Sequence, residues 1–239
     1  MSFCLGIKIE QGLIGIADTR ITTGAEQLSA HKISTHQVGP HSLFVMTSGL
    51  RSVRDKALAY FDEALAAQAQ PGDKLYKAVN VFAQQLRRVA GEDQKTLAKG
   101  GFSFNLHAIV GGQLENDLEP KLYLLYPQGN WVEVTRDSPY YLIGEARHGR
   151  FLLDQALRYQ TPMELALKVG YLAFEATRKS TVNVDFPLDV ALFRQGGGRL
   201  VEHRFAQEDL AELSAWWQEQ IGQLLLRAPT AWAAPILDR

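Results

Sequence analysis

Residues 2–32 read SFCLGIKIEQGLIGIADTRITTGAEQLSAHK, and this segment decides the fold. It contains two apolar runs, Phe3–Ile9 and 13–17, which are separated by Glu10, Gln11 and Gly12. Two apolar runs around so short a polar turn are typical of two strands joined by a tight hairpin. The chain is therefore predicted to begin with a buried hairpin, and the residues at its ends are the first candidates for a functional site.

Ser2 directly follows Met1 and is the candidate nucleophile. Removal of Met1 would leave Ser2 with a hydroxyl and a free α-amine, and such an amine titrates at about 7.7 to 8.0, so it can accept the hydroxyl proton directly or through a water. A serine after the first Met is common and has no significance by itself. Here Asp18, Arg20 and Lys32 follow, and their charges would lower the proton affinity of a neighbouring hydroxyl or amine.

This order of residues resembles the opening of a proteasome-type β subunit, and among these most of all the bacterial Anbu family. The likeness extends to about Phe205 and is carried by these positions: Ser2, the hairpin, Ala17-Asp18-Thr19-Arg20, Thr22-Thr23-Gly24, Lys32, Ser48-Gly49 and Tyr140 to Glu145. The resemblance implies an α+β fold, a four-layer αββα sandwich in which two antiparallel sheets lie between helix pairs. It also implies an N-terminal-nucleophile hydrolase that assembles into rings or helical stacks.

The resemblance assigns roles to the charged residues near Ser2. Lys32 would hold its ammonium close to the nucleophile, Asp18 would hold Lys32 in place and keep it charged, and Arg20 would brace the region of Asp18. The alternative for each is an exposed surface charge, which is less usual at the end of an apolar strand.

The resemblance also indicates a substrate-binding surface. Gly49 would turn its backbone N–H toward the substrate carbonyl as an oxyanion donor, and Thr22 and Thr23 would pair with an extended substrate strand. On sequence grounds alone, Gly49 is equally well explained as a glycine that ends a strand.

The sequence departs from the family in three places. Ser2 stands where Anbu-like chains usually carry threonine, which predicts a working but slower nucleophile. Gly144-Glu145 replaces a Gly-Ser pair, and residues 179–183 replace an Asp-x-x-Ser-Gly pattern. Glu145 is then a candidate to orient the amine, and Ser180 or Thr181 a candidate to supply a hydroxyl. We expect activation to need only the removal of Met1.

Composition excludes several classes of partner. The 239 residues are 46% hydrophobic and show no linker, so they can form one large core. The formal net charge is −1, which gives no attraction to nucleic acid or to an anionic membrane, and no apolar run approaches the roughly 20 residues of a membrane span. The single cysteine, Cys4, is expected to be a buried strand residue, with a reactive thiol as the minor alternative. A cytoplasmic protein is expected.

The order of predicted elements supports the sandwich independently of the resemblance. Four strands are expected before any helix, then a helix over 51–70, a break at Pro71-Gly72-Asp73, a second helix to about Ala90 and a loop over 91–99. Strands follow at 102–111, 121–126, 130–135 and 140–143. Two more helices follow, the second with Thr161-Pro162 at its start, and a last hairpin over 187–204 turns at Gly196-Gly197-Gly198. Strands alternating with helix pairs favour two packed sheets covered by helices.

We expect residues 1–205 to form the proteasome β-like domain and residues 206–239 a C-terminal helix and tail. That helix carries Leu210, Leu213, Trp217, Ile221 and Leu224 along one side. They are expected to close the core of the same domain or, as the second reading, to pack onto a neighbouring subunit.

No cofactor and no metal are expected, because His31, His36, His41 and His107 lack ligand spacing and no glycine-rich phosphate loop precedes a helix. The leading hypothesis is a peptidase or amidase that uses Ser2 on peptide or isopeptide bonds of a peptide or protein substrate, in a self-assembled oligomer. The alternatives are a non-catalytic assembly subunit and an amidase or acyl-transferase acting on a small amide.

Overall fold

The computed structural model describes residues 2–23, 26–67, 73–196 and 200–237. Met1, Gly24, Pro71-Gly72 and Gly197-Gly198, on which parts of the sequence predictions fall, lie outside the described residues. The chain divides into two compact units, Met1–Arg204 and Phe205–Arg239.

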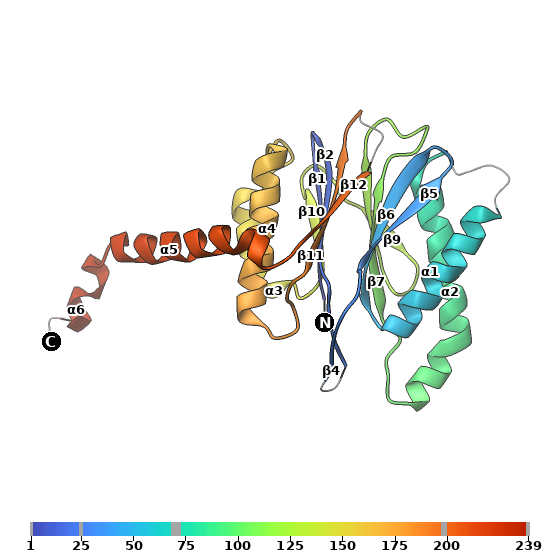
Figure 1. Ribbon diagram of the computed structural model, residues 1–239, viewed down its shortest axis with the longest axis horizontal. Helices are drawn as coiled ribbons and strands as arrows, with labels where there is room; N and C mark the ends of the chain where they lie inside the picture. The colour runs from blue at the N-terminus through green and yellow to red at the C-terminus, as the bar shows by residue number, and fades with distance from the viewer. Residues whose placement is uncertain (1, 24–25, 68–72, 197–199, 238–239) are drawn as a thin grey trace. The chain divides into compact units, whose positions relative to one another are not determined.

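Two five-stranded antiparallel sheets form the centre of the first unit (Figure 1). The first sheet has the order β10-β1-β2-β11-β12, with bounds Tyr140–Gly144, Phe3–Ile9, Gly12–Asp18, Leu188–Arg194 and Leu200–Phe205. The second has the order β5-β6-β7-β8-β9, with bounds Ile33–Val38, His41–Gly49, Leu106–Gly112, Lys121–Leu125 and Trp131–Glu133. The predicted opening hairpin is confirmed as β1 and β2, which pair antiparallel with Cys4 opposite Ala17.

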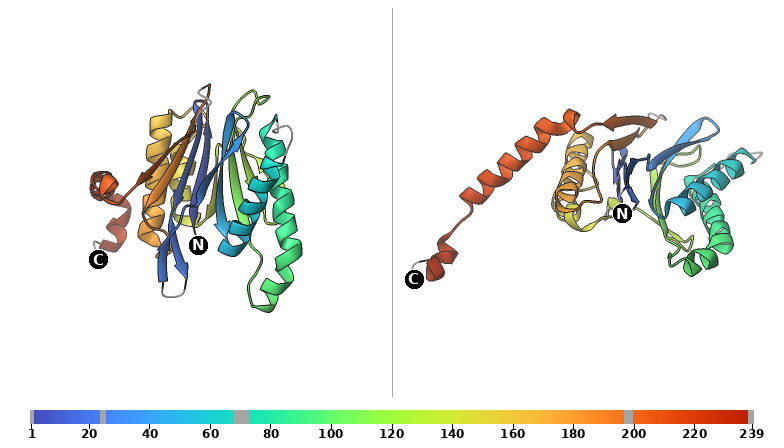
Figure 2. Two further views of the ribbon diagram at one scale, coloured as in Figure 1. Left: turned by 45° about the vertical axis from the view of Figure 1, so that its right-hand side comes forward. Right: turned by 60° about the horizontal axis from the view of Figure 1, so that its bottom comes forward.

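Each sheet is covered on its outer face by a pair of helices (Figures 1 and 2). Helices α1 (Arg51–Ala66) and α2 (Leu75–Lys99) lie against the second sheet, and α3 (Arg147–Ala156) and α4 (Met163–Ser180) lie against the first. The two sheets face each other across a core that includes Cys4, Phe44, Met46 and Ile109. The predicted αββα sandwich is therefore confirmed.

Strand β1 is buried along its whole length, which explains its apolar sequence. All seven of its residues are buried because α4 covers one face and the second sheet covers the other. A strand covered on both faces reads as a continuous apolar run rather than as an alternating one. The N-terminal end of β1 is thus fixed inside the sandwich, and this determines where Ser2 lies.

The loop expected over 91–99 is wrong, because α2 continues through it to Lys99. The polar residues of this stretch form ion pairs on the helix surface: Arg88 contacts Glu92, and Lys56 of α1 contacts both Glu92 and Asp93. Gly91, the first residue of this stretch, has no atom within 4 Å of the position that a Cβ would occupy. A solvent-facing helix stabilised by such pairs carries little apolar periodicity.

The prediction of four strands before the first helix is also wrong, because the described residues before α1 form six. Strands β3 (Arg20–Thr23) and β4 (Glu26–Ser29) form a separate two-stranded hairpin, with Thr22 opposite Gln27. Their sequence lacks the alternation of apolar residues that marks a half-buried strand, so no pattern indicated them.

At the start of α4, Pro162 occupies the cap position, and the Thr161 hydroxyl instead accepts a hydrogen bond from the Arg158 amide.

The C-terminal unit is helical. A short 3-10 turn (Glu208–Leu210) leads into α5 (Ala211–Arg227), and a second turn (Ala231–Ala233) leads into α6 (Ala234–Leu237). None of the residues of α5 is buried, and Trp216, Leu224 and Leu225 are more than half exposed. Within the described residues, none of the helices has the length and apolar character that a membrane span requires.

Candidate active site

The backbone at Ser2 is held from both sides by neighbouring strands. On one side, the Glu145 amide at the end of β10 donates to the Ser2 carbonyl oxygen at 2.7 Å. On the other side, the Phe3 amide donates to the Asp18 Oδ1 at the end of β2, also at 2.7 Å. Ser2 therefore lies at a defined position at the edge of the sandwich, half-buried rather than free in solvent.

Asp18 and Lys32 form a buried ion pair beside Ser2. The Lys32 Nζ donates to Asp18 Oδ1 at 2.6 Å, and the two side chains are 3% and 0% exposed. Burial raises the pKa of the Asp18 carboxyl, while the charge of Lys32 and the hydrogen bonds from Lys32 and the Phe3 amide oppose that shift. A buried charge is retained only when such partners are present.

A second hydrogen bond fixes the position of the ammonium. Lys32 Nζ also donates to the backbone carbonyl oxygen of Arg20 at 2.6 Å. Ser2 and Lys32 line the same cleft, which has a volume of about 720 Å³ and also exposes Ser48 and Gly49. The structure therefore brings the predicted nucleophile, the predicted cation and the predicted oxyanion glycine to one cavity.

Two glycines of the cleft occupy conformations that other residues rarely adopt. Gly49 has a φ of +147°, and a Cβ there would lie 2.1 Å from the Asn105 carbonyl oxygen. Gly144 has a φ of +88°, and a Cβ there would lie 1.8 Å from the Ser2 carbonyl oxygen. Glycine is required at both positions because the backbone passes so close to its neighbours. At Gly49 this agrees with both sequence readings, since the residue ends β6 and also borders the cleft just before α1.

The remaining predicted site residues lie at different distances from the cleft. Arg20 lines it, but its guanidinium turns to Asp185 at 3.0 Å, in the segment before β11. Glu145 contributes its backbone amide to Ser2, as described above. Ser180 lies at the end of α4, where its hydroxyl donates to the Ala176 carbonyl oxygen, and it lines a separate cavity that also includes Arg20 and Thr181. Thr22 and Thr23 lie on β3, the strand that follows Arg20.

Sequence reasoning missed two residues, one that lines the cleft with Ser2 and one that binds Arg20. His107 on β7 pairs with Ser48 on β6, and both line the cleft. Burial lowers the pKa of His107, so its imidazole is neutral at neutral pH. Asp185, the partner of Arg20, lies just beyond residues 179–183 and lines the separate cavity that also includes Ser180. Neither residue carries a local sequence signal, because only the sheet register brings His107 to the cleft and only the packing brings Asp185 to Arg20.

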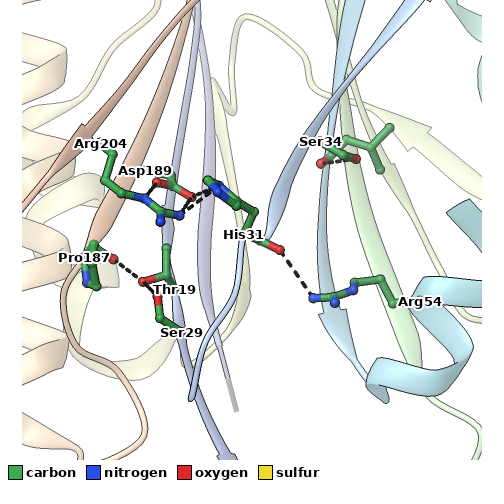
Figure 3. A network of polar contacts seen from close by, with 9 residues as sticks. Thr19, Ser29, His31, Ser34, Arg54, Pro187, Asp189 and Arg204 are labelled. Carbon is green, nitrogen blue, oxygen red and sulfur yellow. Dashed lines mark hydrogen bonds and ion pairs between the residues drawn. The ribbon is translucent and has the colours of Figure 1, made fainter. Parts of the chain in front are cut away.

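The segment that carries Lys32 is anchored to both layers of the sandwich (Figure 3). The His31 Nδ1 lies 3.1 Å from Asp189 Oδ2, and Arg204 bonds the same carboxylate at 2.6 and 2.9 Å. The His31 carbonyl oxygen accepts a hydrogen bond from Arg54 of α1 at 3.4 Å. These contacts restrain the main chain on the N-terminal side of Lys32 and so stabilise the position of its side chain.

Cys4 is excluded as a second nucleophile by its surroundings. It is fully buried, and its thiol donates to the Thr47 carbonyl oxygen at 3.5 Å. Burial raises the pKa of Cys4 to about 12, so the reactive thiolate is absent at neutral pH. The reading of Cys4 as a small buried strand residue is confirmed. Among the residues that the structure describes, no group of three or more His, Cys, Asp or Glu side chains is arranged to hold a metal ion.

Comparison with solved structures finds close similarity to Anbu proteins. The chain aligns with the helical assembly of the Anbu complex from Pseudomonas aeruginosa at a TM-score of 0.89 and 26% identity, covering 95% of this chain and 97% of that one. It aligns with an Anbu mutant from Hyphomicrobium sp. strain MC1 at a TM-score of 0.86 and 25% identity, covering 95% and 99% of the two chains.

A third structure, Anbu (ancestral beta-subunit) from Yersinia bercovieri, gives a TM-score of 0.87 at 23% identity, covering 95% of this chain and 97% of that one, and supports the fold. No protein-family model matches the sequence, and no curated protein matches it. The resemblance to the Anbu family and its proteasome-like fold, inferred above from the first fifty residues, is confirmed by the structural neighbours.

Proposed function

We propose that this chain, an Anbu-like protein with a proteasome-type fold, is a cytoplasmic N-terminal-nucleophile hydrolase that cleaves peptide or isopeptide bonds with Ser2 after removal of Met1. The observation that carries the proposal is the buried ammonium of Lys32. Its two hydrogen bonds, to Asp18 and to the Arg20 carbonyl oxygen, fix a positive charge in the cleft that Ser2 also lines. An ammonium held in a dry site beside a hydroxyl lowers the proton affinity of that hydroxyl.

The reaction that follows from this geometry has two halves. In the first, Ser2 Oγ forms a bond to the substrate carbonyl carbon while the free α-amine of Ser2 accepts the hydroxyl proton. The C–N bond then breaks, and the protonated α-amine of Ser2 returns that proton to the leaving amine. In the second half, water attacks the acyl-enzyme ester while the same amine accepts a proton from the water. The bond between the acyl carbon and Ser2 Oγ then breaks, the protonated amine returns the proton to Ser2 Oγ, and the carboxylic acid product leaves. The Gly49 N–H is proposed to stabilise the oxyanion in both halves.

An extended substrate fits this cleft better than a compact one. Strand β3 leaves the cleft at Arg20 and presents the backbone of Thr22 and Thr23, and Gly49 borders the cleft at the end of β6. A peptide can add to such a backbone as a further strand, with main-chain hydrogen bonds providing affinity. We therefore propose peptide or protein substrates, with Thr22, Thr23 and Gly49 as the binding residues.

One observation favours the non-catalytic alternative. Glu145 stands where classical β subunits carry a serine, and Ser180 points its hydroxyl to the Ala176 carbonyl oxygen and lines a different cavity, so neither supplies a hydroxyl beside the Ser2 amine. An assembly subunit without activity would retain the fold and lose these supports first. A small-amide hydrolase is the remaining alternative, because the same nucleophile chemistry is not restricted to proteins.

Turnover of a mixed fluorogenic peptide library by the purified chain tests the proposal. Ser2→Ala should abolish turnover, and Ser2→Thr should retain it, because threonine keeps the hydroxyl and restricts its rotamer. Ser42→Ala is the matched control, since the Ser42 hydroxyl bonds only Gln37 on the surface of the second sheet. Turnover that survives in Ser2→Ala would remove Ser2 from the mechanism.

We propose further that residues 206–239 are an assembly element and that the chain self-associates into a ring-like or helical homo-oligomer. The neighbour from Pseudomonas aeruginosa is described as a helical assembly. In this chain α5 leaves Trp216, Leu224 and Leu225 at 51%, 63% and 71% exposed. Large exposed apolar residues that gather on one helix are typical of interfaces.

Sedimentation at micromolar concentration tests this assembly proposal. The chain should sediment as an oligomer, and Leu225→Glu should dissociate it. Leu118→Glu is the control, because Leu118 is 97% exposed in the first unit and is an isolated apolar residue. A monomer at this concentration would contradict the proposal.

A further inference from the structure

A second cavity adjoins the cleft at Ser2. It has a volume of about 450 Å³ and is formed by β10, the end of β8 and α3. His107 and Gly144 line both this cavity and the cleft, so the two are continuous at these residues. Gly144 pairs with Phe3 in the sheet, which places the junction directly beside Ser2.

The sheet topology places this cavity on the opposite side of Ser2 from β3. Strand β1 lies between β10 and β2, and the chain passes from β2 through Thr19 into β3. The residues at the ends of β10 and β3 therefore flank the N-terminus of β1 from opposite sides. A substrate strand that pairs with β3 and crosses Ser2 continues toward Gly144 and enters the second cavity.

The cavity is lined mainly by uncharged residues, several of which are aromatic. Tyr126, Tyr141 and His107 contribute partly exposed rings, with the rings of His107 and Tyr126 meeting edge to face at 6.2 Å, and Leu124 and Ile143 form an apolar floor. Burial lowers the pKa of His107 and raises the pKa of Tyr126, so both rings are neutral at neutral pH. Rings arranged in this way bind another aromatic ring by edge-to-face or offset contacts.

The charges of the cavity cancel each other. Arg150 and Asp154, both on α3, are exposed residues of opposite sign at its rim, and the Tyr140 hydroxyl donates to Asp154. A charged substrate side chain would approach one group of its own sign and would have to lose its hydration on the apolar floor. A neutral aromatic side chain avoids both the repulsion by a like charge and this loss of hydration.

We propose that this cavity, here called the tyrosine pocket and lined by Tyr126, Tyr140, Tyr141 and His107, binds a neutral aromatic side chain. Its role as a specificity pocket, holding the part of the substrate that lies beyond Ser2 from β3, rests on the function proposed above. The binding itself does not, because the pocket is complete without a reactive Ser2.

Binding is measured first, with no turnover required. The full chain carrying Ser2→Ala is titrated with N-acetylphenylalaninamide and, as the matched probe, N-acetylleucinamide, and the ring signals of His107 are followed by NMR after assignment with His107→Gln. We expect saturable binding of the aromatic amide that is roughly two- to tenfold tighter than that of the leucine amide. Tyr126→Ala and, separately, Tyr141→Ala should remove this preference, and Tyr76→Ala on α2, outside the pocket, should retain it.

Equal binding of the two amides, no binding of either, or a preference that survives in folded Tyr126→Ala or Tyr141→Ala overturns the inference. A second experiment separates the pocket inference from the proposed function. It measures cleavage of internally quenched peptides in which one phenylalanine is moved along the sequence. Turnover without a positional aromatic preference contradicts the pocket and leaves the function standing. Selective amide binding by a chain whose Ser2 never reacts supports the pocket and contradicts the function.

Discussion

Replacing Lys32 by methionine tests the geometry of the candidate site through stability alone. The substitution keeps an unbranched side chain and removes the ammonium that bonds Asp18 Oδ1 and the Arg20 carbonyl oxygen, both at 2.6 Å. Asp18 would then keep only the backbone amides of Phe3 and Arg20 as donors inside a site where its side chain is 0% exposed. Leaving one partner of a buried ion pair alone costs about 3 to 5 kcal/mol. We expect Lys32→Met to lose that much free energy of unfolding.

A double-mutant cycle measures the interaction free energy between Asp18 and Lys32. Asp18→Asn leaves the Lys32 ammonium without its counter-charge and should also destabilise the fold, whereas Asp18→Asn combined with Lys32→Met removes both charges. The double variant should be more stable than the sum of the single losses by about 1 to 3 kcal/mol. Urea unfolding followed by far-ultraviolet circular dichroism provides the free energies. Lys56→Met, which breaks a partly exposed contact with Glu92 at 2.8 Å, is the control and should lose far less.

The pH dependence of the Lys32→Met deficit has a predicted sign. Burial already raises the pKa of Asp18 in the natural chain. Without Lys32, only the backbone amides of Phe3 and Arg20 oppose the effect of burial, so the pKa of Asp18 rises further above its unfolded value. The stability of such a group is fully present below the unfolded pKa and is lost as the pH rises through the folded pKa. The deficit relative to the natural chain should therefore shrink as the pH falls toward the unfolded pKa of aspartate, about 3.9. Additive single losses, an unchanged stability of Lys32→Met, or a deficit that grows on acidification would refute the buried-pair reasoning.

Four further predictions follow from individual residues. Gly49→Ala should cost about 3 kcal/mol or more in urea unfolding, since its φ of +147° adds strain to a Cβ placed 2.1 Å from a carbonyl oxygen, and a neutral result would contradict that backbone geometry. Gly91→Ala should instead stabilise the chain by about 0.5 to 1 kcal/mol, because Gly91 lies open to solvent inside α2; destabilisation would argue for a loop there. Iodoacetamide at pH 8 should leave Cys4 unmodified in the folded chain and alkylate it in urea, because burial raises the pKa of Cys4 to about 12, and rapid native labelling would contradict the burial. The Lys8 and Arg136 contacts outweigh burial and lower the pKa of Glu119 to about 2, so the stability that Glu119→Gln removes should be present above about 4.5 and vanish as the pH falls toward 2, whereas a pH-independent difference would exclude this linkage.

The sequence predicted the sandwich because its decisive elements carry strong local patterns. The run Phe3–Ile9 is apolar throughout because β1 is covered on both faces. The polar turn that follows it is so short that it can only join β1 to β2 as a hairpin. Strands β3 and β4 were not predicted, because their short hairpin carries no apolar alternation and, among the strands that the structure describes, pairs with no other. The last nine residues of α2 were missed for a related reason, since a helix face held by surface ion pairs has no apolar period to detect.

The site was predictable where its residues are adjacent in sequence to the opening hairpin. Asp18 and Lys32 lie within fifteen residues of each other, and the buried pair joins them as expected. His107 and Asp185 were not predictable, because the first reaches the cleft through the β6–β7 register and the second contacts Arg20 only through the packing of distant segments. Ser180 was a candidate because residues 179–183 stand where the family carries an Asp-x-x-Ser-Gly pattern. In the structure Ser180 is the last residue of α4, and its hydroxyl donates to the backbone of its own helix.

The central claim is that Ser2 is a live N-terminal nucleophile, and intact-mass spectrometry tests it most directly. The intact mass of the purified chain is measured before and after incubation with a serine-directed β-lactone, and the adduct is located by peptide mapping. We predict a chain that lacks Met1 and gains the mass of one acyl group, esterified to Ser2 and absent from Ser2→Ala. A chain that keeps Met1, or that exposes Ser2 and never forms the adduct, would contradict the claim and leave the assembly-subunit reading in its place.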